Sequence, residues 1–221
     1  MFLDERLRKT VSFIVASRRT GREEVGTVFF ICKALDDSDE GEGGDRTAIP
    51  SHHATYAVTT RHIFLNNKGS DFFIRINTTD GSFEDVRTLP DDWKYIPGND
   101  VCVCNLSILL SEYEINLDGR LYLQAHLFSK LATDEYMKGI PVAEGYEVFI
   151  LGLFIGHSGK KQAQPILRFG NIALMPHEKV EIHLSKEDVG EGKYTEIDAY
   201  LIESRSLVDD HRSFDRCSNA R

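Results

Sequence analysis

Hydrophobic residues occur along this chain in short runs rich in Val, Ile, Phe, Tyr and Thr, and Gly, Asn, Asp and Pro separate one run from the next. Short runs of β-branched and aromatic residues between turn residues are typical of β-strands. The pattern therefore predicts a mainly β fold, with strands at Val11–Ser17, Gly26–Ala34, Thr55–Thr60, Asp71–Asn77, Phe83–Leu89, Val101–Leu109, Glu147–Phe154, Ile166–Met175, Val180–Leu184 and Ile197–Glu203.

These runs fall into two groups, because six precede and four follow a segment with a different pattern. That segment, Leu121–Lys138, lacks strand alternation and carries residues that a helix tolerates. We expect it to be the crossover between two halves of one domain over residues 1–221. Two successive groups of short strands are what a duplicated β-barrel would produce.

Two polar loops interrupt the runs. Asp36–Asp45 is acidic and rich in Gly, and Gly156–Gln164 is small and basic. We expect both to be solvated surface loops. Calcium binding by the acidic loop is the alternative, but the spacing of an EF-hand with its terminal Glu is absent.

The balance of charges restricts the partners of this chain. Its 221 residues include 26 Lys and Arg against 35 Asp and Glu, which gives a formal net charge of -9. Such an acidic chain disfavours nucleic acid and anionic membranes as main partners. Charges interrupt the apolar run that an N-terminal secretory signal requires, and no later run is long enough to span a bilayer. We therefore expect a cytoplasmic protein.

The cysteines and adjacent histidines do not form a convincing metal site. Cys32, Cys102, Cys104 and Cys217 contain no CxxC pair, and Cys102 and Cys104 share one face of a predicted strand. We expect buried thiols rather than disulfides or a zinc site. The pair at positions 52 and 53 would point to opposite faces of a strand, so a solvated loop is expected there and no metal is predicted.

Three segments of the first half form a pattern. Residues 26–29 read Gly-Thr-Val-Phe and begin one predicted strand, residues 59–62 read Thr-Thr-Arg-His and end another, and residues 100–103 read Asp-Val-Cys-Val and open a third. A lone His has ordinary packing roles, and a lone Asp is common in turns. The three segments together, in this order, carry the prediction.

In this order the segments resemble the trypsin-like serine peptidase family, in particular its bacterial intracellular members. There the first barrel has a Gly-Thr-x-Phe strand, a Thr-Ala-x-His turn and an Asp-x-Ala-x strand, and here Thr60 and Cys102 stand where Ala is usual. Gly145–Gly152 and Pro165–Ala173 look like strands of its second barrel. The resemblance implies two antiparallel β-barrels, the first over about 1–115 and the second over about 140–206.

The resemblance also implies peptide-bond hydrolysis by a Ser-His-Asp mechanism, which uses side chains and water and needs no cofactor. His62 would be the general base, and Asp100 would hold the imidazole in the required tautomer and stabilise its charged form. The substrate would be a peptide or a protein.

The nucleophilic serine has no clear counterpart. The family places a Gly-x-Ser-Gly turn after the strand that ends near Ser206, whereas residues 207–217 contain no glycine. Ser213 is the candidate within that stretch. Residues 156–159 spell Gly-His-Ser-Gly, but polar residues follow them instead of an apolar strand, so we expect a surface hairpin there.

We therefore expect an incomplete or inactive member of this family, with an incomplete second barrel and a divergent tail over 207–221, from a truncated or frame-shifted product. An incomplete barrel leaves an open strand edge, which a partner chain would cover. One alternative is a catalytically inactive pseudoprotease that binds peptides or a partner in the same cleft. Another is an unrelated β-rich scaffold with a chance His and Asp.

Overall fold

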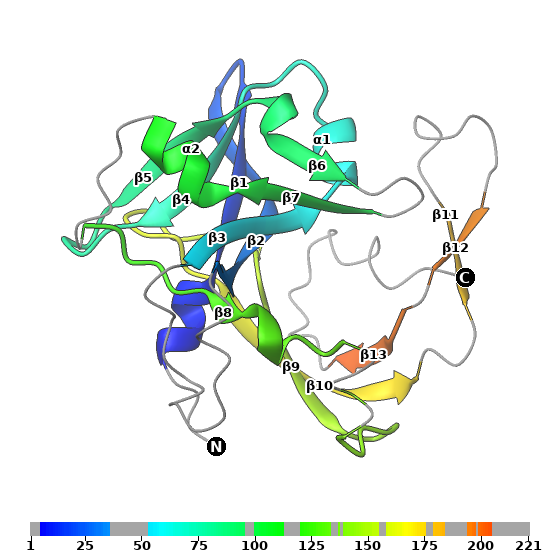
Figure 1. Ribbon diagram of the computed structural model, residues 1–221. Coiled ribbons are helices and arrows are strands. Elements are labelled where there is room, and N and C mark those ends of the chain that lie inside the picture. Colours follow the sequence, from blue (N-terminus) through cyan, green and yellow to red (C-terminus); the bar gives the residue numbers. More distant parts are fainter. Residues whose placement is uncertain are drawn as a thin grey trace. The chain divides into compact units, whose positions relative to one another are not determined.

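The computed structural model describes residues 5–35, 53–95, 100–112, 120–133, 137, 139–154, 158–175, 179–183, 194–197 and 199–204 (Figure 1). The chain is mainly β, as its hydrophobic pattern predicts. It divides into two compact units, and each is described here by itself. The first unit is Met1–Ile140 with Leu151–Ile166, and the second is Pro141–Ile150 with Leu167–Arg221.

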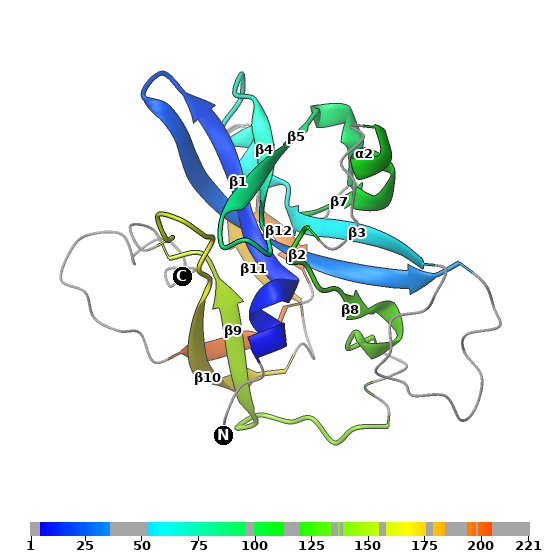
Figure 2. The same cartoon turned by 90° about the vertical axis from the view of Figure 1, so that its left-hand side faces the viewer.

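The first unit contains an eight-stranded sheet that curls strongly (Figures 1 and 2). Neighbouring strands along its main path are antiparallel, and one short strand, β8, pairs with β2 in the parallel sense. The path runs through β5 (Phe83–Thr88), β4 (Phe72–Asn77), β1 (Val11–Arg18), β2 (Gly21–Ala34), β3 (His53–Thr60), β7 (Val101–Asn105) and β6 (Trp93–Tyr95), and β8 is His126–Leu127.

A β-bulge between β1 and β2 contributes to the curl. Ile14 lies opposite Gly26 and Val15 lies opposite Glu24, so Val25 is the extra residue on β2. A bulge of this kind bends its strand and increases the local twist. The curled sheet encloses the hydrophobic core, whose buried members are Ile14, Ala16, Val28, Phe30, Ala57, Ile63, Phe72, Ile74, Ile76, Val86, Trp93, Cys102, Cys104, Leu106, Leu109 and Leu110.

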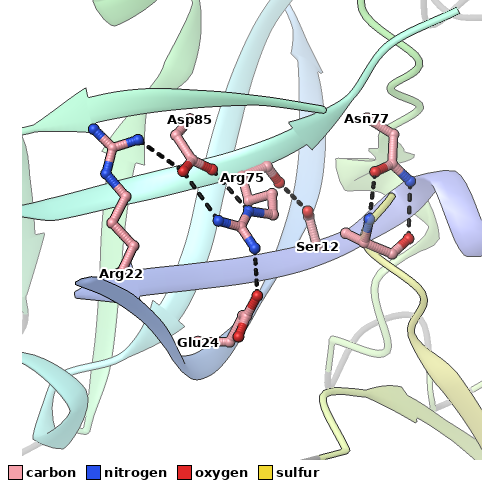
Figure 3. Close-up of polar contacts among 7 residues, drawn as sticks. Ser12, Arg22, Glu24, Arg75, Asn77 and Asp85 are labelled. Carbon is pink, nitrogen blue, oxygen red and sulfur yellow. Dashed lines mark hydrogen bonds and ion pairs between the residues drawn. The ribbon is translucent and has the colours of Figure 1, made fainter. Parts of the chain in front are cut away.

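A charged network ties β2, β4 and β5 together (Figure 3). The guanidinium of Arg75 donates to both carboxylate oxygens of Asp85, from Nε at 2.8 Å and from Nη2 at 3.0 Å, and it also pairs with Glu24. Arg22 adds a second cation to Asp85 at 2.9 Å. The side chains of Arg75 and Asp85 are only 10% and 6% exposed, so these ions are paired inside the protein rather than in water.

Short helical elements join the strands of the first unit. Two are α-helices, α1 (His62–Leu65) and α2 (Leu106–Glu112), and the 3-10 turns are η1 (Glu5–Thr10), η3 (Pro90–Asp92) and η4 (Phe128–Lys130). No helix within the described residues is long and apolar enough to cross a membrane.

The second unit contains most of a three-stranded antiparallel sheet and a separate two-stranded pair. The sheet has the order β13 (Leu201–Ser204), β10 (Ile166–Leu174) and β9 (Glu147–Gly152). The pair consists of β11 (Val180–His183) and β12 (Tyr194–Ile197), with Val180 opposite Ile197.

Two predicted strands are wrong in part. The strand predicted over Ile197–Glu203 begins too early, because Ile197 ends β12 and β13 begins at Leu201. The strand predicted over Val101–Leu109 ends at Asn105, and α2 begins at Leu106. The side-chain Oδ1 of Asn105 accepts the backbone N–H of Ile108 at 3.1 Å, which is how an Asn caps the start of a helix. The predicted crossover Leu121–Lys138 contains, in its described part, the short strand β8 and the turn η4.

Candidate active site

The pairing of β3 with β7 brings His62 next to Asp100. Thr60, the last residue of β3, lies opposite Val101, the first residue of β7. Because the two strands are antiparallel, the residues just after β3 lie beside the residue just before β7. The backbone N–H of Arg61 accordingly donates to the carbonyl oxygen of Asp100 at 2.9 Å.

The carboxylate of Asp100 makes two hydrogen bonds to His62. Its Oδ1 accepts the backbone N–H of His62 at 2.9 Å, and its Oδ2 lies 2.6 Å from the Nδ1 of the imidazole. An ionised carboxylate can only accept, so Nδ1 carries the proton and a neutral ring keeps its lone pair on Nε2. The imidazole is 51% exposed. The arrangement presents an oriented base to its surroundings.

Helix α1 holds the histidine through its neighbours in sequence. Ile63 is buried against Gly26, and the ring of Phe64 lies 4.8 Å from that of Phe72. The side-chain amide of Asn67 donates to the carbonyl oxygen of Ile63 at 2.6 Å and so closes the end of the helix. His62 therefore begins a short helix that is fixed on its buried side.

Thr27 connects the strand before the histidine with the segment that follows β9. Its carbonyl oxygen accepts the hydroxyl of Thr59 at 2.6 Å, and its own hydroxyl oxygen accepts the backbone N–H of Leu153 at 2.8 Å. Thr27 is the Thr of the Gly-Thr-Val-Phe segment. The carbonyl oxygen and the hydroxyl of Thr27 thus each have a structural partner.

The cysteine near the site is not a nucleophile. Burial, assisted by the nearby negative charge of Asp100, raises the pKa of the Cys102 thiol to about 11, although the positive charge of Arg61 opposes this shift. The thiol is therefore protonated near neutral pH. Cys32 and Cys104 are also buried, as predicted, and Cys217 lies outside the described residues.

The predicted nucleophile is not among the residues that the structure describes. Ser213 lies outside them, and so do His52 and the loop over 36–45. Ser158 of the Gly-His-Ser-Gly segment is described, and its carbonyl oxygen accepts the N–H of Gln164 at 2.9 Å, which folds the loop on itself. Within the described part of the chain, no hydrogen bond joins Ser158 to His62.

A cation beside the histidine was not anticipated by the sequence motifs. The guanidinium carbon of Arg61 lies 4.3 Å from the ring centre of Tyr95 in β6. Tyr95 lies opposite Cys102 of β7, so this stack forms at the same end of the sheet as His62 and Asp100. The Arg before the His and the Tyr two residues before the Pro-Gly-Asn-Asp sequence were visible in the sequence, but nothing there indicated their contact.

Comparison with known proteins adds no relative. No protein family, curated protein or solved structure matches this chain. Its function has to be inferred from its own residues.

Proposed function

We propose that this chain derives from the trypsin-like serine peptidases, with His62 as the general base and Asp100 as the carboxylate that orients it. The observation that carries the proposal is the pair of hydrogen bonds from His62 to Asp100, one from the backbone N–H and one from Nδ1, which leave Nε2 available. The proposed nucleophile is Ser213, and the proposed substrate is a peptide or a protein.

The proposed chemistry follows from the oriented imidazole. A hydroxyl beside Nε2 would pass its proton to that nitrogen while its oxygen attacks the peptide carbonyl. The imidazolium, stabilised by the Asp100 carboxylate, would then protonate the leaving amine as the C–N bond breaks. A water molecule activated by the same nitrogen would release the acid and restore the hydroxyl.

The two-barrel architecture belongs to the same proposal. The curled sheet of the first unit would be the first barrel, and β9, β10 and β13 would belong to a second, incomplete one. The support is that both units are built mainly from antiparallel strands and that His62 and Asp100 lie at the ends of neighbouring strands of the first unit.

A catalytically inactive, peptide-binding relative is the second candidate. It is favoured by residues 207–217, which contain no glycine, because backbone N–H groups converge into an oxyanion hole most readily in a sharp glycine turn. The edge strand β6 would offer a peptide backbone hydrogen-bonding groups.

Labelling with a serine-reactive fluorophosphonate tests the enzyme proposal. We expect the full chain to be labelled on Ser213, as located by mass spectrometry, and Ser213→Ala to lose the label. His62→Ala and Asp100→Asn are each expected to slow labelling by at least about 100-fold, since both support the base. His53→Ala, at the opposite end of β3, is the matched control and is expected to label at the wild-type rate.

Two outcomes would count against the enzyme. A folded wild-type chain that is not labelled would contradict the peptidase proposal. Peptide binding without catalysis would then be the remaining candidate. Labelling that is equally fast in His62→Ala would show that the serine is activated without this histidine, which contradicts the proposed role of the pair.

A further inference from the structure

Arg61 differs from the other arginines that stack on aromatic rings in the first unit. Arg22 lies over Phe73 and Arg75 lies over Phe83, each at 3.9 Å, and both are also paired with Asp85. Arg61 lies over Tyr95, but within the described residues no acceptor is hydrogen-bonded to its guanidinium. Its ring contact is therefore not accompanied by a carboxylate.

The carboxylate of Asp100, whose carbonyl accepts the N–H of Arg61, is bound by His62. Both oxygens of Asp100 accept hydrogen bonds from His62. A guanidinium has five N–H donors at its edge, and stacking uses only its face. The guanidinium of Arg61 therefore keeps its N–H donors for another acceptor. It does so although the chain has 35 acidic residues against 26 basic ones.

The position of Arg61 is fixed from both sides of its backbone. Its N–H donates to the carbonyl of Asp100 at 2.9 Å, and its carbonyl accepts the N–H of Phe64 at 3.0 Å. The side chain is half-buried, while the ring beneath it, Tyr95, is 52% exposed. A fixed backbone and an aromatic support leave the guanidinium at the surface with little freedom to lose on binding.

We propose that Arg61, supported by Tyr95, is a specificity-determining residue that binds the carboxylate of an Asp or Glu side chain in a peptide lying across His62. The inference rests on the proposed function for the location of the peptide, and it adds the chemical class of side chain that is recognised. The planar fork of the guanidinium matches the two oxygens of a carboxylate.

Matched peptides test this inference without requiring turnover. The probes are short, alanine-rich peptides carrying tetramethylrhodamine that are neutral apart from one Glu, or one Gln in its place, which is moved along the sequence. Binding is measured by fluorescence anisotropy to the full chain carrying Ser213→Ala, which removes the proposed nucleophile and leaves the hydrogen bonds between His62 and Asp100 in place. We expect at least one Glu peptide to bind about 5- to 10-fold more tightly than its Gln counterpart, the size typical of a partly exposed charge-assisted bond.

Variants of the stack then assign the preference. In the same background, Arg61→Gln is expected to bring the Glu-to-Gln ratio to about one, and Arg61→Lys to retain part of it, since a charge remains without the planar fork. Tyr95→Ala is expected to weaken the preference, and Tyr95→Phe to keep it. Lys33→Gln is the control, because it removes one exposed cation that lies over an aromatic ring, that of Phe128. Lys33 is on β2, next to the end of β3 that is far from His62.

Each remaining outcome decides between the two proposals. Equal binding of Glu and Gln peptides by wild-type Arg61, an unchanged ratio in a folded Arg61→Gln chain, or no peptide binding at all would overturn the role of Arg61. An Arg61-dependent preference in a chain that never reacts with fluorophosphonate would support the acidic-peptide site and remove the peptidase. Labelling and hydrolysis with no preference for acidic peptides would support the peptidase and contradict the role of Arg61.

Discussion

Ile63 packs so closely onto Gly26 that a β-carbon at position 26 would lie 2.0 Å from its Cδ1 and 2.9 Å from its Cγ1. Ile63 is only 6% exposed and follows His62 in α1. The absence of a side chain at Gly26 therefore sets how closely α1 approaches β2. Because α1 begins at the histidine, this contact also positions the imidazole relative to Asp100.

We expect Gly26→Ala to lower the free energy of unfolding by about 1–3 kcal/mol, since it overpacks a filled contact. Urea denaturation measures the loss. Ile63→Val removes the clashing Cδ1 and is expected to cost about 1 kcal/mol in the wild-type background. In the Gly26→Ala background the same change should cost less or restore stability, and strictly additive losses would contradict the packing argument.

The buried cation Arg75 is expected to matter far more for stability than an exposed one. Arg75→Ala would leave Asp85 with Arg22 alone and Glu24 without its partner, and we expect a loss of about 3–5 kcal/mol in urea denaturation. Arg87→Ala is the comparison, because Arg87 pairs with Asp71 at the surface, where both side chains are more than half exposed. It should cost at most about 1 kcal/mol. Equal losses of unfolding free energy would show that the buried ion pairs stabilise the fold no more than the exposed pair does.

Asn77 binds the loop between β9 and β10, which belongs to the same compact unit, through both ends of its side-chain amide. Its Nδ2 donates to the carbonyl of Ala163 at 2.9 Å, and its Oδ1 accepts the N–H of the same residue at 2.7 Å (Figure 3). Ala163 is 4% exposed, whereas Lys160 and Lys161 nearby are exposed. An asparagine side chain thus pairs with a main-chain segment as a neighbouring strand would.

We expect Asn77→Asp to release this loop, because a carboxylate cannot donate to the Ala163 carbonyl and repels it. Cleavage by added trypsin after Lys160 or Lys161 should become about 10-fold faster or more, in line with a loss of about 1–3 kcal/mol. Asn66→Asp, at an exposed position on the same unit, is the control and should cut at the wild-type rate. An unchanged rate in Asn77→Asp would mean that other contacts hold the loop.

Local hydrophobic patterns predicted a strand well where its apolar residues alternate with polar ones or follow one another without interruption. Strand β1 was predicted to within a residue because its apolar residues are contiguous, and the start of β2 was missed because Arg22, Glu23 and Glu24 look like a loop. Two of these charged residues are paired with Arg75 or Asp85 on other strands. Tertiary ion pairs of this kind have no signal in a single run of sequence.

The same distinction applies to the site. His62 and Asp100 were predicted from motifs, and strand register explains why they meet. The stack of Arg61 on Tyr95 depends on side chains from different strands, so no local spacing could predict it. The role of Ser213 stays a prediction, since it lies outside the described residues.

The thiol of Cys102 predicts a loss of stability at alkaline pH. Its pKa is raised from 9.0 to about 11 in the folded protein, first by burial and then by the charge of Asp100. The folded state therefore holds this proton more tightly than the unfolded state. The resulting stabilisation is complete below pH 9 and is lost as the pH rises from about 9 through about 11.

We expect the free energy of unfolding to fall by about 2–3 kcal/mol over this range on account of Cys102, as two pKa units require. Urea denaturation at a series of pH values measures the slope, and Cys102→Ala should remove this part of it. Val103→Ala, on the same strand but without a titrating group, should leave the slope as it is. If Cys102→Ala kept the full alkaline slope, the thiol would have to ionise as easily in the folded chain as in the unfolded one, and its burial beside Asp100 would have no electrostatic consequence.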